Sequence, residues 1–485
     1  MTPASVGVAR GILRNAGALF LVGMFAKGAG LVIAILVARF LGAGAMGLFA
    51  VLFSVSVLIE AFISLGMSDS LVRDVAARPV DAPEMFIAAL KLVGIISVLP
   101  TAGLLVAAWL FADQPAAREC LVILAFGTPV SGAFVVASAV LQGSERVLLL
   151  TWVTFVARLV SLAFLAWLFF RNAGIAAAFV SRILFHLLAL AVFAHVILRG
   201  REKARAAHSP RRLLGRAVPF AVNTAIRELA TRLPALLLPT SVGLTSSGIF
   251  DSANRVRSTL GMTMSASITG LMPAFARSRG EPEERAATLI GYSMKYMCIG
   301  MAMVATGITV LAGWIVHLLY GSAFAGAALP LQMLAWAQVL TAVDAVLQQA
   351  MLARQAVVPA IRHSATGVAL QGALLALLSW KFGLPGASAA VLTAAAATLA
   401  MDLVYVVRRV ARIPFWHFAG APLLATSCIA VLLLSTSELS LPIRMLIAVG
   451  SWVGAVAIFR VLPRDELRFM LQLVMPTRNR SPGGS

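Results

Sequence analysis

Charged residues are scarce in this chain, and acidic residues are the scarcest. Only 12% of its 485 residues are charged, 60% are hydrophobic, and the mean hydropathy is +0.95. A soluble protein of this length needs far more charge to cover its surface. Apolar stretches of roughly 20 residues recur along the chain, and each can cross ~30 Å of hydrocarbon. The composition therefore excludes an ordinary soluble domain and predicts an all-α, polytopic membrane protein.

The spacings that build metal, disulfide or nucleotide sites are also missing. The three cysteines lie far apart, and the six histidines form no HExxH cluster. The chain has neither a phosphate-loop nor a dinucleotide-binding fingerprint, so we expect no cofactor and no metal. A membrane glycosyltransferase or sugar polymerase would need carboxylates in sizeable aqueous loops. The expected outer loops are short and their acids, Asp113 and Glu438, are isolated, so we expect no enzyme.

A net charge of +20 could indicate nucleic-acid binding, but the distribution of the basic residues argues against it. They punctuate the apolar segments and form no single solvated face. With the N-terminus inside, 25 lie in inner segments and only four in outer loops, namely Arg118, Arg171, Lys381 and Arg444. The excess of positive charge on one side predicts that both termini are cytoplasmic.

Hydropathy predicts about fourteen spans. They cover 16–41, 46–67, 85–112, 119–142, 148–170, 174–198, 217–240, 247–272, 289–312, 327–352, 358–380, 386–407, 417–435 and 442–460. The predicted units are an N-lobe of six spans (1–198), a basic cytoplasmic linker (199–216), a C-lobe of six spans (217–410), two extra spans (411–462) and a cytoplasmic tail (463–485).

An internal repeat supports the division into two lobes. The pattern Gly42-x4-Gly47-Leu48-Phe49 recurs as Gly243-x4-Gly248-Ile249-Phe250, and at the same offset of 201 residues Arg78 falls on Arg279. Six spans in each half keep the halves in one orientation, so the repeat is parallel about an axis along the membrane normal. Two such lobes facing a central cavity are typical of an alternating-access transporter.

Four short motifs resemble a known family. The run Val37–Gly42 followed by Gly47–Phe49 is similar to the first-loop signature of polysaccharide-type flippases, and Ser247–Arg255 resembles their second-repeat signature. Leu319–Phe324 resembles a short outer loop of that family, and Gly383–Ser388 the loop between its eleventh and twelfth spans. The resemblance runs along nearly the whole chain in order and spacing.

These flippases of lipid-linked oligosaccharides belong to the multidrug/oligosaccharidyl-lipid/polysaccharide exporter superfamily. The resemblance implies transport of an undecaprenyl-pyrophosphate-linked oligosaccharide from the cytoplasmic to the outer face of a bacterial inner membrane. The product would be exopolysaccharide, O-antigen or capsule, and partners would include a polysaccharide polymerase and glycosyltransferases besides membrane lipid. A lipid II flippase and a cation-coupled multidrug antiporter are the alternatives, and coupling to Na+ or H+ is left open.

Charges inside the spans are the candidates for function, because a charge in lipid is costly without a partner or a wet cavity. The predicted substrate-binding cations are Lys27, Arg158, Arg182, Arg227 and Arg255. The predicted coupling or gating acids are Glu60, Glu228, Asp251 and Asp344. Guanidinium groups bind phosphate oxygens bidentately, so these cations fit a pyrophosphate. The first span offers Lys27 and no carboxylate, which disfavours a cation antiporter.

Pairing within one helix is the competing interpretation. Glu228 with Arg232, and Asp251 with Arg255, are spaced i, i+4, whereas Lys27, Arg158 and Arg182 have no acid at such spacings. Lys27 aligns with Glu228 in the repeat, which suggests a gate across the cavity.

Two polar helix faces and three basic residues near span ends are also predicted to have defined surroundings. Ser56, Glu60 and Ser64 form one stripe, and Gln338, Thr341, Asp344 and Gln348 form another, both as expected beside a hydrated cavity. Arg39, Lys91 and Lys295 lie near span ends, and we expect them to snorkel to headgroups.

Overall fold

The computed structural model describes residues 3–64, 67–199, 210–277, 283–410, 418, 420–436 and 439–459, and every regular element in them is helical. Side chains of residues 3–27, 69, 210–224, 227, 260, 262–274, 276–277, 283, 286 and 456–459 are not among those described. The elements are α1 (Pro3–Ser64), α2 (Met67–Ala77), η1 (Pro79–Asp81), α3 (Ala82–Leu110), α4 (Pro115–Gly143), α5 (Val147–Phe170), α6 (Ala176–Leu198), α7 (Pro210–Arg277), α8 (Glu283–Tyr320), η4 (Ser322–Ala327), α9 (Ala328–Ala353), α10 (Val357–Arg409), α11 (Ala421–Ser435) and α12 (Leu441–Phe459).

Three of these helices fold back on themselves. At 62, 68 and 53 residues, α1, α7 and α10 would each extend ~80–100 Å if straight, far beyond the ~30 Å of hydrocarbon. Each is interrupted at one glycine: Gly42 (φ 80°), Gly243 (φ 81°) and Gly383 (φ 62°). Glycine adopts this left-handed region without the steric cost of a Cβ atom. In the described residues nine long and two shorter apolar helices, three of them doubled, give the fourteen spans predicted.

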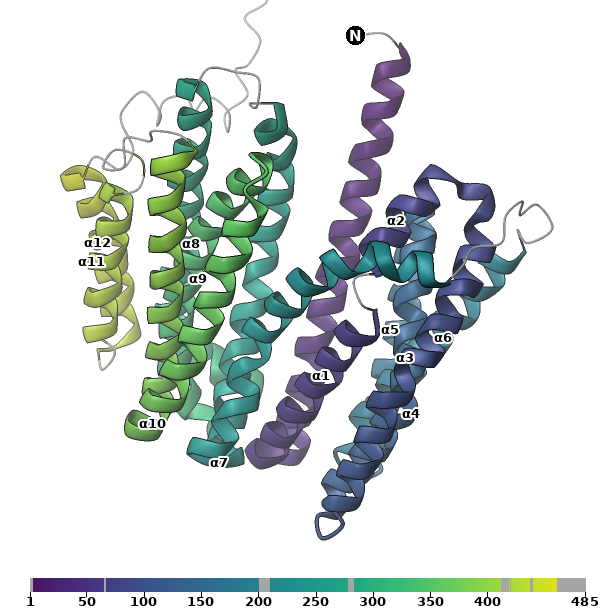
Figure 1. Cartoon of the computed structure of the whole chain (residues 1–485). Coiled ribbons are helices and arrows are strands. Elements are labelled where there is room, and N and C mark those ends of the chain that lie inside the picture. The colour runs from purple at the N-terminus through teal and green to yellow at the C-terminus, as the bar shows by residue number, and fades with distance from the viewer. Residues whose placement is uncertain are drawn as a thin grey trace, which may run out of the picture.

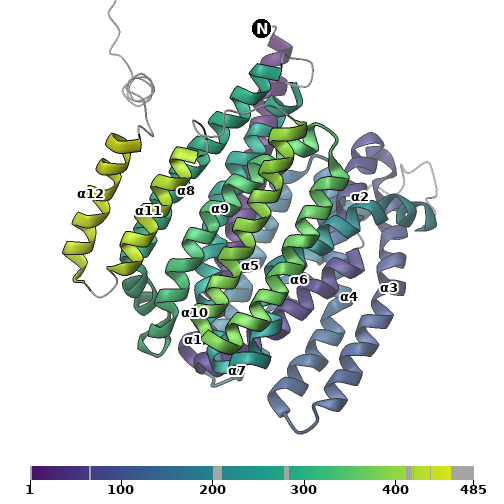
Figure 2. The ribbon, with the colours of Figure 1, turned by 60° about the vertical axis from the view of Figure 1, so that its left-hand side comes forward.

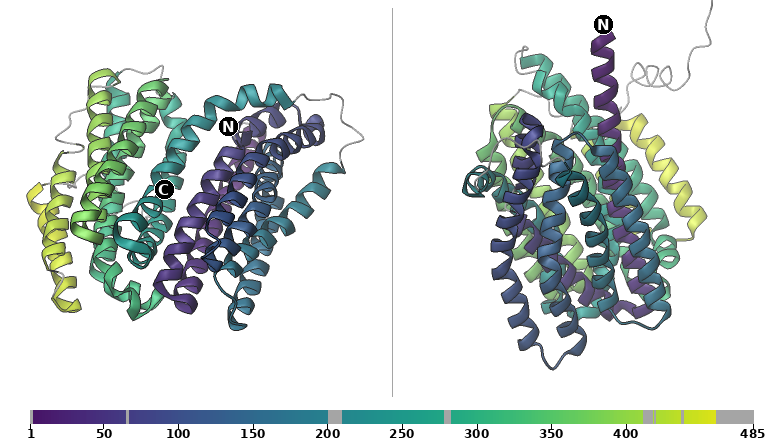
Figure 3. Two further views of the ribbon diagram at one scale, coloured as in Figure 1. Left: turned by 60° about the horizontal axis from the view of Figure 1, so that its bottom comes forward. Right: turned by 90° about the vertical axis from the view of Figure 1, so that its right-hand side faces the viewer.

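The spans form two bundles that stand side by side (Figures 1 and 3). The N-lobe contains α1 to α6, and the C-lobe contains α7 to α10. The ribbons of α1 and α7 meet where each of these helices folds back on itself. The lobes diverge toward the end that carries the N-terminus (Figure 1). The short helix α2 bridges them at that end by contacting α4 and α7. Helices α11 and α12 pack against α8 on the outer flank of the C-lobe (Figure 2).

The junction between the lobes is built from the repeated glycines. A Cβ atom on Gly47 would lie 1.9 Å from the carbonyl oxygen of Leu244, and one on Gly248 would lie 2.1 Å from that of Ala43. Each glycine therefore packs on the residue that follows the turn glycine of the other lobe. This reciprocal contact confirms the sequence repeat and explains why it has glycine at both positions.

Two arginines near helix ends satisfy carbonyl groups of α8. Arg39 donates hydrogen bonds to the carbonyl oxygens of Leu318 and Leu319, at 2.9 Å for the latter, where this helix ends. The buried Arg444 donates to the carbonyl oxygens of Thr309 and Val310 at 2.5 and 3.1 Å. Arg444 thus lies in the first turns of α12 and not in a loop, and it fastens that helix to α8.

Lys295 does not snorkel as predicted. Only 2% of its surface is exposed, and its ammonium group lies 5.9 Å from the ring centroids of Tyr292 and Tyr296 on the same helix. The reason is that α11 and Phe418, which precedes it, cover α8 here: Phe418 packs on Tyr292, and Thr426 of α11 contacts Cys298. The span pattern cannot reveal that a helix near a lobe edge is covered by a later one.

Candidate functional site

A cavity of about 440 Å³ lies inside the N-lobe. Residues of α1, α4, α5 and α6 line it, and among them are Arg158, Arg182 and Glu60. Five phenylalanines also line it, namely Phe49, Phe53, Phe134, Phe179 and Phe185. The structure thus brings together three of the predicted site residues from three different helices.

Arg182 on α6 forms an ion pair with Glu60 on α1, with 2.6 Å between Nη2 and Oε1. Its other terminal nitrogen donates a hydrogen bond to Ser56 Oγ. Both partners belong to the polar stripe predicted on the second span. Of this stripe Glu60 lines the cavity, which lies inside the N-lobe and not between the lobes as expected. The search for acids within one helix missed this pair, because Glu60 and Arg182 are 122 residues apart.

Arg158 on α5 is held differently. Its guanidinium carbon lies 3.4 Å from the ring centroid of Phe185, which is a stacked cation–π contact. Within the described residues no carboxylate forms an ion pair with it, although Glu60 and Arg182 are close enough to affect it electrostatically. A guanidinium stacked on one face keeps its edge donors available to a ligand.

Phe53 joins the cavity to the C-lobe. Three guanidinium carbons lie near its ring, those of Arg182 at 4.9 Å, Arg255 at 5.1 Å and Arg232 at 5.2 Å. Arg182 belongs to the N-lobe, whereas the other two belong to α7. Sequence reasoning missed Phe53, although its spacing of three and seven residues to Ser56 and Glu60 places it on the same helical face.

The two pairs predicted within α7 are confirmed. Asp251 Oδ2 lies 2.6 Å from Arg255 Nε, and Glu228 Oε2 lies 3.7 Å from Arg232 Nε. Arg232 also lies close enough to Arg255, Asp251 and Arg182 to interact with them electrostatically. Because Arg182 belongs to the N-lobe, the charges of both lobes form one interacting cluster. The side chains of Lys27 and Arg227 lie outside the described residues, so the Lys27–Glu228 gate stays a prediction.

The charges of this group do not balance. Around the cavity and Phe53, the described side chains include four arginines and three carboxylates. Each carboxylate has its own arginine, which leaves Arg158 in excess. Electrostatic attraction is strengthened where aromatic walls exclude water. The arrangement is suited to an anionic group that reaches Arg158 and competes for the neighbouring guanidinium groups.

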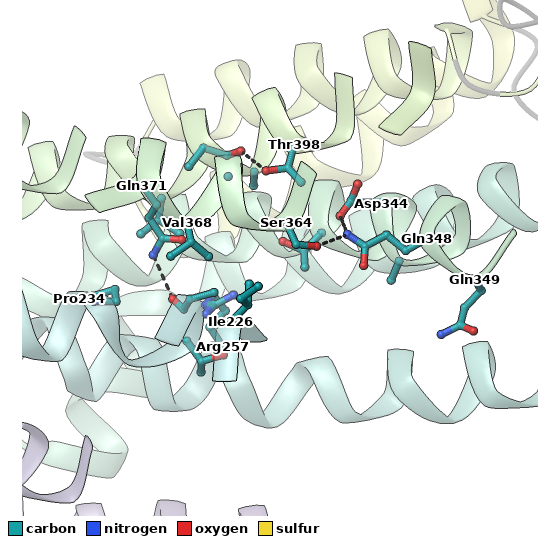
Figure 4. A pocket seen from close by; sticks show the side chains of 18 residues that line it. Ile226, Pro234, Arg257, Asp344, Gln348, Gln349, Ser364, Val368, Gln371 and Thr398 are labelled. Carbon is teal, nitrogen blue, oxygen red and sulfur yellow. Dashed lines mark hydrogen bonds between the residues drawn. The ribbon is translucent and has the colours of Figure 1, made fainter. Parts of the chain in front are cut away.

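A second hollow, of about 320 Å³, lies within the C-lobe between α7, α9 and α10 (Figure 4). Its polar side chains are mostly neutral, with Gln348, Gln349, Gln371, Thr341 and Thr398 among them. The predicted stripe on α9 does face a hollow, but one inside the C-lobe and not between the lobes. The acid of that stripe is therefore separated from the other predicted acids.

One arginine, Arg257, also lines this pocket, but its hydrogen bonds go to protein groups. It donates to Asn254 Oδ1 and to Gln338 Oε1, both at 2.9 Å. In the described residues no group of three or more potential ligand side chains could hold a metal ion. The two hollows thus differ in charge as well as in place.

Comparison with known proteins identifies the family. The family model described as "Polysaccharide biosynthesis protein" matches residues 12–279, which is more than half of the chain. A comparison with curated proteins gives no match.

Solved structures share the fold at low sequence identity. The lipid II flippase MurJ in an inward closed conformation is 13% identical with a TM-score of 0.66, covering 93% of this chain and 100% of that one. An inward-facing multidrug resistance MATE family transporter of the MOP superfamily is 17% identical with a TM-score of 0.67, covering 81% and 98%. A MOP superfamily transporter from Pyrococcus furiosus, reported to have a binding pocket of reverse polarity, is 15% identical with a TM-score of 0.61, covering 89% and 96%.

The fold of this chain is similar to that of the lipid II flippase and of a MATE transporter of the MOP superfamily. The chain belongs to the polysaccharide biosynthesis protein family, and its long apolar helices indicate a multi-pass membrane protein.

Proposed function

We propose that this protein is a flippase for an undecaprenyl-pyrophosphate-linked oligosaccharide in polysaccharide biosynthesis. It would carry the headgroup from the cytoplasmic to the outer face of the bacterial inner membrane, with both termini cytoplasmic. In this proposal the N-lobe cavity binds the pyrophosphate.

The observation that carries the proposal is the unbalanced guanidinium of Arg158. A pyrophosphate offers several charged oxygens, and it can accept hydrogen bonds from Arg158 while drawing Arg182 away from Glu60. A cation–drug antiporter requires the opposite balance, with unpaired carboxylates in the cavity. Glu60 is the one carboxylate that lines this cavity among the described side chains, and it is paired.

Phe53 offers a way to link binding to alternating access. Its ring lies among arginines of both lobes, so an anion that pulls on Arg182 also affects Arg232 and Arg255. A ligand shifts a conformational equilibrium only by binding one state better than the other. When the lobes rock apart, the arginines of the C-lobe move away from Phe53. The anion would therefore bind the two conformations with different affinity.

The test is mass spectrometry of lipid extracts from cells that carry the gene, lack it, or express a variant. Loss of the gene is expected to cause accumulation of one undecaprenyl-pyrophosphate oligosaccharide, and Arg158→Ala is expected to reproduce it. Arg171→Ala is a matched control, because this exposed arginine also stacks on an aromatic ring, that of Trp167, outside the cavity.

The alternatives predict other outcomes. Accumulation of lipid II would assign the protein to peptidoglycan synthesis, an option favoured by the MurJ match, which covers 93% of this chain. An unchanged lipid-linked pool together with increased sensitivity to cationic drugs would contradict the flippase proposal and support an antiporter.

A further inference from the structure

The two hollows occupy equivalent places in the two lobes. Gly30 and Ile33 of α1 line the N-lobe cavity, and Thr231 and Pro234 of α7, 201 residues later, line the second hollow, here called the C-lobe hollow. A parallel repeat has its axis along the membrane normal, so equivalent positions lie at one depth in the membrane. A headgroup that reaches both lobes therefore meets two hollows of different chemistry at the same level.

The amide groups around the C-lobe hollow keep acceptor oxygens that no described protein group uses. Gln371 Nε2 donates to the carbonyl oxygen of Ala230, and Gln348 Nε2 donates to Ser364 Oγ, both at 3.3 Å (Figure 4). The amide oxygens of these two glutamines receive no hydrogen bond from the described residues. Gln349 Oε1 is buried and has no partner there either. Three amide oxygens are thus left for a ligand that brings donors.

Charged and flat apolar ligands fit this hollow poorly. Its one arginine, Arg257, already donates to two protein groups. Its one described carboxylate, Asp344, accepts a hydrogen bond from Gln348 Nε2 at 3.2 Å. One cation engaged by the protein and one carboxylate give little selectivity for either sign of charge. The described lining includes no aromatic side chain, so a flat ligand finds no ring on which to stack.

Hydroxyl groups match this lining. Each hydroxyl both donates and accepts, so a polyhydroxylated ring can donate to the free amide oxygens and accept from the Ser364 hydroxyl. The volume of about 320 Å³ lies in the range of small-molecule pockets, ~300–1,000 Å³. Ile226, Pro234 and Val368 supply aliphatic surface for the carbon atoms of such a ring. We propose that the C-lobe hollow is a binding subsite for a neutral sugar unit of the transported glycan.

This subsite rests on the proposed function, because the sugar reaches the C-lobe as part of a diphosphate-linked headgroup. Sugar and diphosphate belong to one molecule, so binding of one raises the effective concentration of the other at its own hollow. A headgroup with its diphosphate in the N-lobe and a sugar in the C-lobe contacts both lobes at once. The C-lobe hollow therefore distinguishes a glycan-loaded lipid carrier from a bare one.

Native mass spectrometry of the purified full-length protein tests the subsite. The probes are undecaprenyl diphosphate, either bare or carrying one glucose, galactose or N-acetylglucosamine. The wild type is expected to retain at least one of the three glycosylated lipids about 10-fold better than the bare lipid. Gln371→Leu and Gln349→Leu should each lower this preference roughly 3- to 10-fold, as expected for the loss of one neutral hydrogen bond, without changing the affinity for the bare lipid. Gln349→Leu is expected to fold, because the buried oxygen that it removes has no partner.

Gln332→Leu is the matched control and should keep the preference of the wild type. Gln332 also belongs to α9 and donates from Nε2 to a backbone carbonyl, that of Thr309 at 3.1 Å, but it does not line the hollow. Equal retention of the bare and all three glycosylated lipids by the wild type would overturn the subsite, and so would an undiminished preference in both hollow variants. Failure of the proposed function gives a different result, namely equal retention of bare undecaprenyl diphosphate and undecaprenol.

Discussion

The two lobes share one backbone plan and have different chemistry in their hollows. In the N-lobe, Phe53 and Glu60 of α1 face a cavity with two arginines, and Ser56 accepts a hydrogen bond from one of them, Arg182. The positions 201 residues later, on the equivalent turn of α7, hold Asn254, Arg257 and Gly261. Where α1 has an aromatic and an acidic side chain, α7 has an amide and a basic one. Arg257 donates hydrogen bonds to Asn254 and Gln338, both in the C-lobe.

The difference indicates how two halves of a repeat can keep one backbone and acquire different binding chemistry. The turn glycines and the glycines at the junction, which fix the backbone, are the same in both halves. The side chains one to five turns further along are not. We therefore infer that the repeat supplies the two-lobe geometry, while divergence of the cavity residues confines the proposed anion site to the N-lobe.

The largest effect is expected from removing one partner of the N-lobe ion pair. Arg182→Ala leaves Glu60 partly buried without its cation, which costs ~3–5 kcal/mol for a buried pair. Thermal unfolding of the purified protein should show a clear loss of stability. The double variant Arg182→Gln with Glu60→Gln is expected to regain much of it, because no charge is left unpaired, and still to lose transport. Equal stability of the single variant and the wild type would show that the pair does not hold α6 to α1.

Breaking the symmetric junction is expected to have a smaller effect. Gly47→Ala places a methyl group against the carbonyl of Leu244, and overpacking of this kind costs ~1–3 kcal/mol. The unfolding temperature should fall, and Gly248→Ala should behave alike because its contact is reciprocal. Gly44→Ala is the control on the same helix, since its nearest side-chain atom would be 3.6 Å away. A drop for only one of the two junction glycines would contradict the symmetry of the contact.

The smallest effect on lipid binding is expected in the C-lobe. Arg257 already donates to Asn254 and Gln338, so we expect Arg257→Ala to change the affinity for a lipid diphosphate by no more than roughly twofold. Binding of the lipid to the purified variant checks this expectation. A loss as large as that of Arg158→Ala would place the anion site in the C-lobe or between the lobes.

The fold was predictable from the sequence because lipid leaves few alternatives. Backbone groups in hydrocarbon must bond within helices, so apolar length alone locates the spans. The turns at Gly42 and Gly243 were also visible in the sequence, because the motif around the first recurs around the second. The sequence could not predict which helix covers which. The packing of α11 and α12 on α8 leaves no local sequence pattern, and for this reason the surroundings of Arg444 and Lys295 were not foreseen.

The site was predictable only where its contacts are local. The pair of Asp251 with Arg255 follows from the spacing of one helical turn. The pair of Glu60 with Arg182 joins helices far apart in the chain, and no spacing rule could have predicted it. Phe53 was visible as a member of a helical face, but its role depends on arginines from both lobes.

The central claim is that the excess guanidinium of the N-lobe binds the diphosphate of a lipid carrier. Native mass spectrometry of the purified protein with undecaprenyl diphosphate, and with undecaprenol as the uncharged control, tests it most directly. The wild type is expected to retain the diphosphate in preference to the alcohol. Arg158→Ala should weaken that binding roughly 10- to 100-fold, since a hydrogen bond to a charged group contributes ~1.5–3 kcal/mol. Equal retention of both lipids, or unchanged binding in Arg158→Ala, would contradict the account.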